Sequence, residues 1–171
     1  MQWSLVGSEM CIRDSFTNGS SFHRVLWDDA EKGSSSTELA KDKNIRRVVM
    51  CSGKVYFDLL EERDARGLND IYLLRFEQFY PFPAMSALKE LERFQNAEMV
   101  WCQEEPKNQG AWSFMEPNIE WVLSRMKAKF KRPIYVGRPA SASPATGLAS
   151  QHKEQQKLLV EEALNLKENK K

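Results

Sequence analysis

The chain has 171 residues, of which 42% are hydrophobic and 29% charged, and its formal net charge is +1. This length and balance are typical of one soluble domain with its own core. The near-neutral charge argues against binding nucleic acid or an anionic membrane surface. Apolar runs such as Val48 to Cys51 are too short to cross a bilayer, and no basic segment followed by a long apolar stretch marks a signal peptide.

The potential metal ligands and thiols are scattered. Three cysteines, Cys11, Cys51 and Cys102, form neither an even disulfide framework nor a close pair, and the two histidines are His23 and His152. We therefore expect reduced, partly buried thiols, no thiol nucleophile paired with a histidine, and no metal site.

The chain up to residue 44 lacks the period of a helix or a strand. Residues 1–15 resemble a non-native tag of the kind that arises when adapter DNA is translated, so we expect them to add nothing to function. Residues 16–44 predict an irregular linker from a missing upstream domain, with a short extended piece between Phe22 and Trp27.

From residue 45 onward, strands and helices alternate. Apolar runs predict buried strands at 48–51, 71–76, 98–103 and 134–136. Apolar residues at helical spacing predict helices around 56–63, 85–94, 119–126 and 159–166. This alternation predicts an α/β domain over 45–166, a three-layer, mainly parallel sheet with helices on both faces, followed by a charged tail, 167–171.

Local signals suggest where three of the helices begin or end. The first helix places three apolar residues and Arg63 on one face, and Gly67 is positioned to end it. Ser113 and Glu116 have the spacing of a capping box for the third helix, and Ser150 is the expected cap of the last one.

The turn between Trp101 and Trp112 follows the carboxyl end of a predicted strand, where ligands and partners tend to bind. Glu104 and Glu105 are adjacent, and neighbouring side chains at a strand end usually diverge, so they do not predict a joint acid–base pair. We expect one to bond to backbone or arginine and the other to face a domain interface. The residues assigned to that interface are Glu104, Glu105, Asn108, Gln109 and Trp112.

The turn after the first strand contains a single glycine, and it matches no dinucleotide or phosphate-loop fingerprint. Ser52, Gly53 and Lys54 could bind an anion at the helix N-terminus, or form a plain tight turn. The loop from Arg138 to Gly147 could contact a partner domain or an anionic ligand, or be a solvated connection. No catalytic residue follows from composition and spacing.

Four blocks of sequence carry a family resemblance: 48–60, 75–83, 101–112 and 135–147. In order and at the expected spacing, they resemble the C-terminal domain of 2-oxoglutarate dehydrogenase, decarboxylating component, across roughly 16–166. The resemblance implies a transketolase C-terminal fold.

The family implies a homodimeric oxidoreductase of the tricarboxylic acid cycle. It decarboxylates 2-oxoglutarate on thiamine diphosphate with magnesium and passes the succinyl group to a lipoyl arm of the dihydrolipoyl succinyltransferase component. Its cofactor-binding and catalytic residues lie in upstream domains, so this fragment is expected to be inactive alone and to support domain and dimer packing. The amino-acid sequence of the four blocks favours a bacterial type of the protein, located in the cytoplasm. A eukaryotic relative would lie in the mitochondrial matrix.

The resemblance also implies an effector site for acyl-CoA or a nucleotide, to which Gln78 corresponds. The arginine pair expected just after the Pro-x-Pro turn is Met85 and Ser86 here, which argues against acyl-CoA regulation. An alternative function is therefore a free-standing regulatory module for an anionic effector. Its candidate residues are Ser52, Lys54, Gln78 and Arg138, together with Arg46 and Arg47. A third function, a small hydrolase using Glu104 or Glu105, ranks below both.

Overall fold

The computed structural model describes residues 22–33 and 35–164, and within them one five-stranded sheet has the order β1-β3-β2-β4-β5. The strands are β1 Val25–Leu26, β2 Arg47–Cys51, β3 Ile71–Phe76, β4 Glu98–Pro106 and β5 Ile134–Arg138. Strand β1 pairs antiparallel with β3, and all other pairs are parallel. The four predicted strands are confirmed, although β4 extends to Pro106 and takes in both glutamates of the predicted turn.

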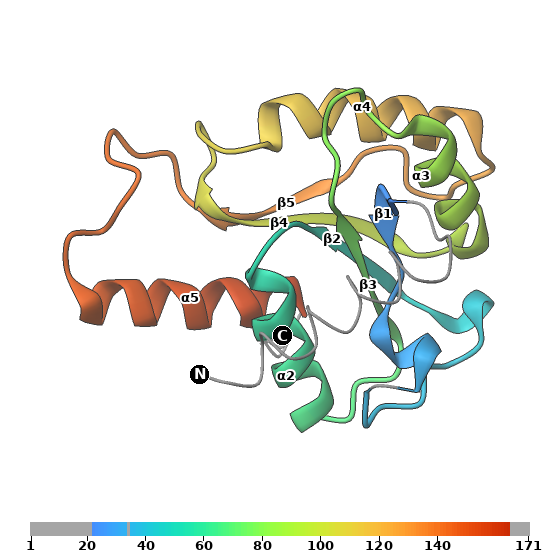
Figure 1. Ribbon diagram of the computed structural model, residues 1–171, viewed down its shortest axis with the longest axis horizontal. Coiled ribbons are helices and arrows are strands. Elements are labelled where there is room, and N and C mark those ends of the chain that lie inside the picture. Colours follow the sequence, from blue (N-terminus) through green and yellow to red (C-terminus); the bar gives the residue numbers. More distant parts are fainter. Residues whose placement is uncertain (1–21, 34, 165–171) are drawn as a thin grey trace, which may run out of the picture.

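Helices cover both faces of the sheet. They are α2 Val55–Ala65, α3 Ala84–Leu91, α4 Trp112–Arg125 and α5 Ala149–Ala163, with short 3-10 helices at Asp29–Lys32, Asp42–Asn44 and Glu92–Phe94. Figure 1 shows α3 and α4 on one side of the strands and α2 and α5 on the other. The predicted three-layer, mainly parallel α/β fold is confirmed, and none of the described helices has the length and apolar character needed to span a membrane.

Two cores lie on opposite faces of the sheet. Val48 and Met50 belong to the core shared with α3 and α4, whereas Val49 and Cys51 belong to the core shared with α2 and α5. Successive strand residues point to opposite faces, and both faces are covered. This explains why the strand at 47–51 is a continuous apolar run rather than an alternating one.

Two of the predicted helix caps are wrong. Helix α4 begins at Trp112, before Ser113, and helix α5 begins at Ala149, before Ser150; in neither helix does the side chain of the N-cap residue make a capping hydrogen bond. At α4 the backbone N–H of Trp112 donates to Oε1 of Gln103, at 2.9 Å, so a buried strand residue replaces the local cap. The stop at Gly67 is confirmed, since this residue has a φ of 61° and Leu68 N–H donates back to Arg63.

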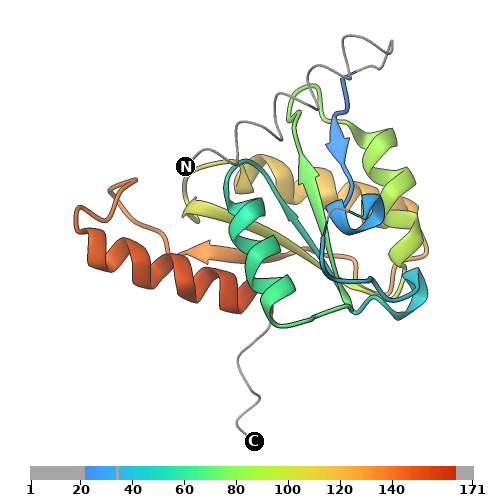
Figure 2. The ribbon, with the colours of Figure 1, turned by 60° about the horizontal axis from the view of Figure 1, so that its bottom comes forward.

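The segment 22–44, predicted to be irregular, supplies the edge strand β1. Figure 2 shows β1, in blue, beside β3 and running in the opposite direction. Further along, Ala40 N–H donates to the carbonyl of Asn69 at 2.8 Å. The segment therefore packs as part of the domain, while its connection to an upstream domain stays a prediction. Residues 1–21 and 165–171 lie outside the described part, and so do the predictions for the tag, for Cys11 and for the tail.

Candidate functional site

A groove of about 760 Å³ opens at the carboxyl ends of β2 and β4, beside the start of α2. Its lining comes from the turn after β2, the loop after β3, strand β4 and the start of α4. The lining residues are Ser52, Gly53, Lys54, Phe79, Tyr80, Trp101, Gln103, Glu104, Glu105, Gly110, Ala111 and Phe114. The parallel pairing of β2 with β4 brings these loops to one edge, because their carboxyl ends point the same way.

The groove unites residues from both predicted sets, Ser52 and Lys54 with Glu104 and Glu105. The other two effector candidates do not line it. Gln78 donates from Nε2 to the carbonyl of Pro81 at 2.8 Å, and Arg138 donates from Nε to the carbonyl of Glu104 at 2.8 Å.

Lys54 is the cation of the groove, and carboxylates already flank it. Its Nζ lies 3.0 Å from Asp58 and 3.4 Å from Glu104. The hydrogen bond to Asp58 is the largest influence on the pKa of Lys54; together with Glu104 it raises that pKa, although partial burial opposes the rise. Lys54 thus stays charged at neutral pH, and an anionic ligand would compete with two carboxylates for it.

The two glutamates play different parts. The carboxylate of Glu104 pairs with Lys54, and its carbonyl accepts from Arg138. The carbonyl of Glu105 accepts from the hydroxyl of Tyr135 at 3.1 Å and from Nε2 of Gln103 at 3.3 Å. These backbone contacts fix the path of the strand end without using the Glu105 carboxylate.

Gln103 organises the turn from inside. This residue is 4% exposed, and its Oε1 accepts from Nε1 of Trp101 at 3.0 Å and from the backbone of Trp112. Its Nε2 donates to the carbonyls of Pro106, at 3.2 Å, and Gln109, at 2.8 Å. A buried amide whose oxygen and nitrogen are both hydrogen-bonded in this way fixes the turn, and no local sequence pattern marks it.

Asn108 and Gln109 bind within the chain. Both Asn108 Nδ2, at 3.0 Å, and Gln109 Nε2, at 3.1 Å, donate to the carbonyl of Ser141, whose own N–H donates to Asn108 Oδ1. The turn is thereby tied to the loop after β5. Trp112 is 6% exposed and lies 5.2 Å, between ring centroids, from Tyr135. These residues hold two loops together and leave little of Trp112 for a partner.

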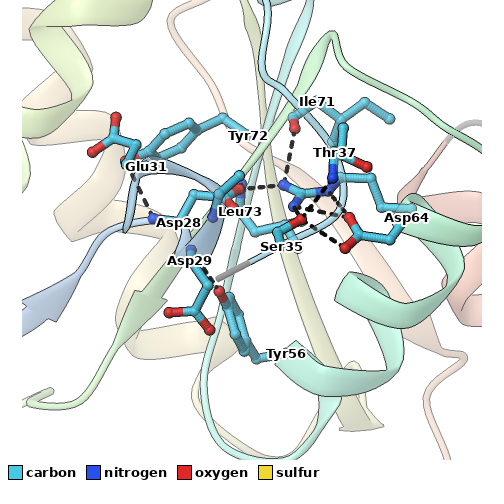
Figure 3. A network of polar contacts seen from close by, with 12 residues as sticks. Asp28, Asp29, Glu31, Ser35, Thr37, Tyr56, Asp64, Ile71, Tyr72 and Leu73 are labelled. Carbon is cyan, nitrogen blue, oxygen red and sulfur yellow. Dashed lines mark hydrogen bonds and ion pairs between the residues drawn. The ribbon is translucent and has the colours of Figure 1, made fainter. Parts of the chain in front are cut away.

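A second polar cluster, missed by the sequence analysis, is sealed inside the domain (Figure 3). Arg63 and Asp28 form an ion pair, and both side chains are 0% exposed. Asp28 also accepts from the backbone N–H of Leu73 at 2.7 Å and of Ala30 at 3.0 Å. The carboxylate therefore joins the segment before β2 to both α2 and β3.

The same cluster holds the surrounding loop. Arg63 also donates to Asp64 and to Oγ of Ser35, each at 3.2 Å. Desolvation raises the pKa of Asp64, but hydrogen bonds from Ser35 and Thr37 and the charge of Arg63 outweigh it, so the pKa is lowered. The position of Arg63 among apolar residues on one helix face was the available signal of a buried charge.

The described cysteines belong to the core shared with α2 and α5. Cys51 and Cys102 are free and buried, as expected, and burial raises the pKa of Cys51 to about 12. Across residues 22–33 and 35–164, no group of three or more His, Cys, Asp or Glu could hold a metal ion.

The fold and the groove define a three-layer α/β domain with an aromatic-lined cleft at the strand carboxyl ends. A sequence model of the family described as 2-oxoglutarate dehydrogenase C-terminal matches residues 11–164. The chain therefore belongs to this family.

Curated relatives agree with the family match. The 2-oxoglutarate dehydrogenase E1 component of Brucella anthropi is 62% identical over 146 residues, which cover 85% of this chain and 15% of the relative. That of Brucella abortus is 62% identical over 149 residues, covering 85% of this chain and 14% of the relative. The chain thus spans about one seventh of the length of these relatives.

Proposed function

We propose that this chain forms the C-terminal domain of a 2-oxoglutarate dehydrogenase decarboxylating component and that it is catalytically silent alone. The observation that carries the proposal is the family match over residues 11–164, together with relatives at 62% identity named as the E1 component. The proposed role of the domain is structural, supporting the packing of upstream domains and of a homodimer. The proposed setting is the cytoplasm of a bacterium.

The full-length protein would decarboxylate 2-oxoglutarate on thiamine diphosphate with magnesium, then pass the succinyl group to the lipoyl arm of a succinyltransferase. The groove does not fit this cofactor. A diphosphate requires an excess of donors and positive charge, and here Lys54 already pairs with Asp58 and Glu104. No described cluster offers a set of ligands for magnesium. The proposal accordingly assigns cofactor binding and chemistry to upstream domains of the full-length subunit.

A chimera tests the proposal. Residues 16–164 replace the matching C-terminal segment of the Brucella anthropi E1 component, and 2-oxoglutarate decarboxylation is measured with thiamine diphosphate and magnesium. We expect activity from the chimera, none from the 171-residue chain alone, and none from the relative truncated before the segment. Turnover by the chain alone, or an inactive but folded chimera, would contradict the proposal.

The alternative, a regulatory module for an anionic effector, draws on Ser52 and Lys54 in the groove. It receives less support, because Asp58 and Glu104 already neutralise Lys54. Calorimetric titration of the chain with acetyl-CoA and with AMP separates the two functions. Heat that is lost in Lys54→Met would favour the effector module, and no heat at millimolar ligand would remove it.

A further inference from the structure

Exposed aromatic side chains gather where β2, β3 and β4 have their carboxyl ends. We call four of them the edge aromatics: Phe22, Phe57, Tyr80 and Phe114, which are 70%, 51%, 83% and 38% exposed. The remaining large hydrophobics with comparable exposure, in the described part of the chain, are Met85 at the start of α3 and the more dispersed Trp121, Ile134, Leu148 and Leu158. A gathering of exposed apolar groups on a soluble domain usually marks an interaction surface.

Backbone contacts place Phe22 beside the loop that follows β3. The N–H groups of Glu77 and Gln78 donate to the carbonyl of Arg24, at 3.0 and 3.2 Å. Because β1 runs antiparallel to β3, the residues before β1 lie next to the residues after β3. Phe22 and Tyr80 therefore belong to the same edge.

Two of the edge aromatics, Tyr80 and Phe114, line the groove together with Gly53, in the turn just before α2. Phe57 lies outside the groove lining, in the first turn of that helix, and its ring centroid is 5.5 Å from the guanidinium carbon of Arg75, near the end of β3. The four aromatics thus share the carboxyl edge of the sheet, and two of them line its groove.

The described charges around the groove are largely paired within the domain. Lys54 contacts Asp58 and Glu104, and Arg75 lies 2.7 Å from Glu77. A partner at this edge would meet neutralised ion pairs and open aromatic faces. Such a surface favours an apolar partner held by burial rather than one steered by long-range charge.

The path of the chain identifies the occupant. The described chain enters the domain at Phe22, on this edge, and the chain spans about 15% of the length of the Brucella anthropi relative. Consecutive parts of a polypeptide are usually neighbours in space. In a full-length subunit, the preceding part would join the described domain at its Phe22 end, which lies on the edge of the edge aromatics.

We propose that the edge aromatics dock this domain onto the preceding part of the same polypeptide, through an apolar surface on that part. The proposal rests on the proposed function, because only a full-length subunit supplies the occupant. Of the interface predicted from the sequence, Glu104 and Glu105 line the same groove. Asn108 and Gln109 bind Ser141 within the domain, and Trp112 is 6% exposed.

Hydroxyl-radical labelling of the chimera described above tests the docking. We expect Tyr80 to be labelled roughly tenfold more slowly than its 83% exposure in the domain implies, since docking would bury it. Phe57 should be protected as well. Trp121, which is 44% exposed on α4, serves as the internal control and should be labelled as its exposure implies. Tyr80 labelled at the rate of an exposed tyrosine would overturn the proposal.

Variants give a second readout. Tyr80→Lys and Phe57→Lys in the chimera should open the interface, so that Phe114 becomes more strongly labelled, and Trp121→Lys and Leu158→Lys should not. All four residues are more than 40% exposed, which lets the domain itself tolerate the changes. Circular dichroism of each variant verifies folding. Equal effects of the two pairs would contradict the docking.

The activity and labelling experiments test the proposed function and the proposed docking separately. A folded chimera without decarboxylation counts against the proposed function, whereas the labelling decides the docking whether or not the chimera turns over. An active chimera with an exposed Tyr80 contradicts the docking alone. Protection that disappears on dilution would identify a second copy as the occupant and would likewise overturn the proposal.

Discussion

Arg63 and Lys54 are both cations of the α2 region, and each faces two carboxylates, but in opposite surroundings. Arg63 is sealed between Asp28 and Asp64 with 0% of its side chain exposed. Lys54 pairs with Asp58 and Glu104 with 64% of its side chain exposed. Water can replace the contacts of Lys54 at little cost, but not those of Arg63. The first cluster therefore fixes the fold, and the second can exchange partners.

The largest expected effect comes from breaking the sealed pair. Asp28→Asn leaves Arg63 charged and without its buried counter-ion, and we expect a loss of about 3 kcal/mol in the free energy of unfolding. Urea denaturation of the chain measures this. In the control, Arg63→Met combined with Asp28→Leu removes both charges and should recover part of the loss. Arg66→Ala breaks the solvent-exposed ion pair between Arg66 and Glu62 and serves as the reference. A smaller loss for Asp28→Asn than for Arg66→Ala would contradict the buried role of the Asp28–Arg63 pair.

The next largest effect on stability is expected at Gly110, which lines the groove. It has a φ of 66°, and an added Cβ would lie 2.9 Å from Cβ of Glu105 and 3.0 Å from Nε2 of Gln103. Gly110→Ala should destabilise the fold by about 2 kcal/mol through backbone strain and crowding. Gly147→Ala is the matched control, with a φ of 74° and open space around it, and it should cost about half as much. Equal costs in denaturation would remove crowding at Gly110 as a factor.

A smaller effect concerns pH. The pKa of Asp64 is lowered below its ordinary value of 3.8, so the contribution of Asp64 to stability is complete above that value and is lost as the pH falls through the lowered pKa. Asp64→Asn should therefore lose less stability than the unchanged chain between about pH 5 and about pH 2. Thermal unfolding across this range gives the comparison. If the stability of the two proteins falls equally as the pH is lowered, Asp64 is not stabilised as a carboxylate.

The smallest effect is expected at Lys54. Lys54→Met removes two solvent-exposed ion pairs and should change the free energy of unfolding by no more than about 0.5 kcal/mol. Urea denaturation of Lys54→Met and Asp28→Asn under the same conditions compares the open cluster with the sealed one. A loss comparable to that of Asp28→Asn would mean that the groove cluster is also structural.

Periodicity alone determined the strand and helix order, because both rest on local patterns of apolar residues. The run at 48–51 predicted a strand covered on both faces, and its residues do divide between two cores. Gly67 was recognisable as a helix stop, since a left-handed backbone favours glycine. The four motif blocks indicated the family, which the match over residues 11–164 confirms.

Tertiary structure decided what depends on residues far apart in the chain. The pairing of Asp28 with Arg63, 35 residues apart, turned a segment read as linker into an edge of the domain. Gln103 capped the start of α4 in place of Ser113, and the carboxyl edge collected aromatics from four separate segments. Local sequence patterns carry no record of such contacts, because each depends on the strand order and on which side chains the two cores exclude from water.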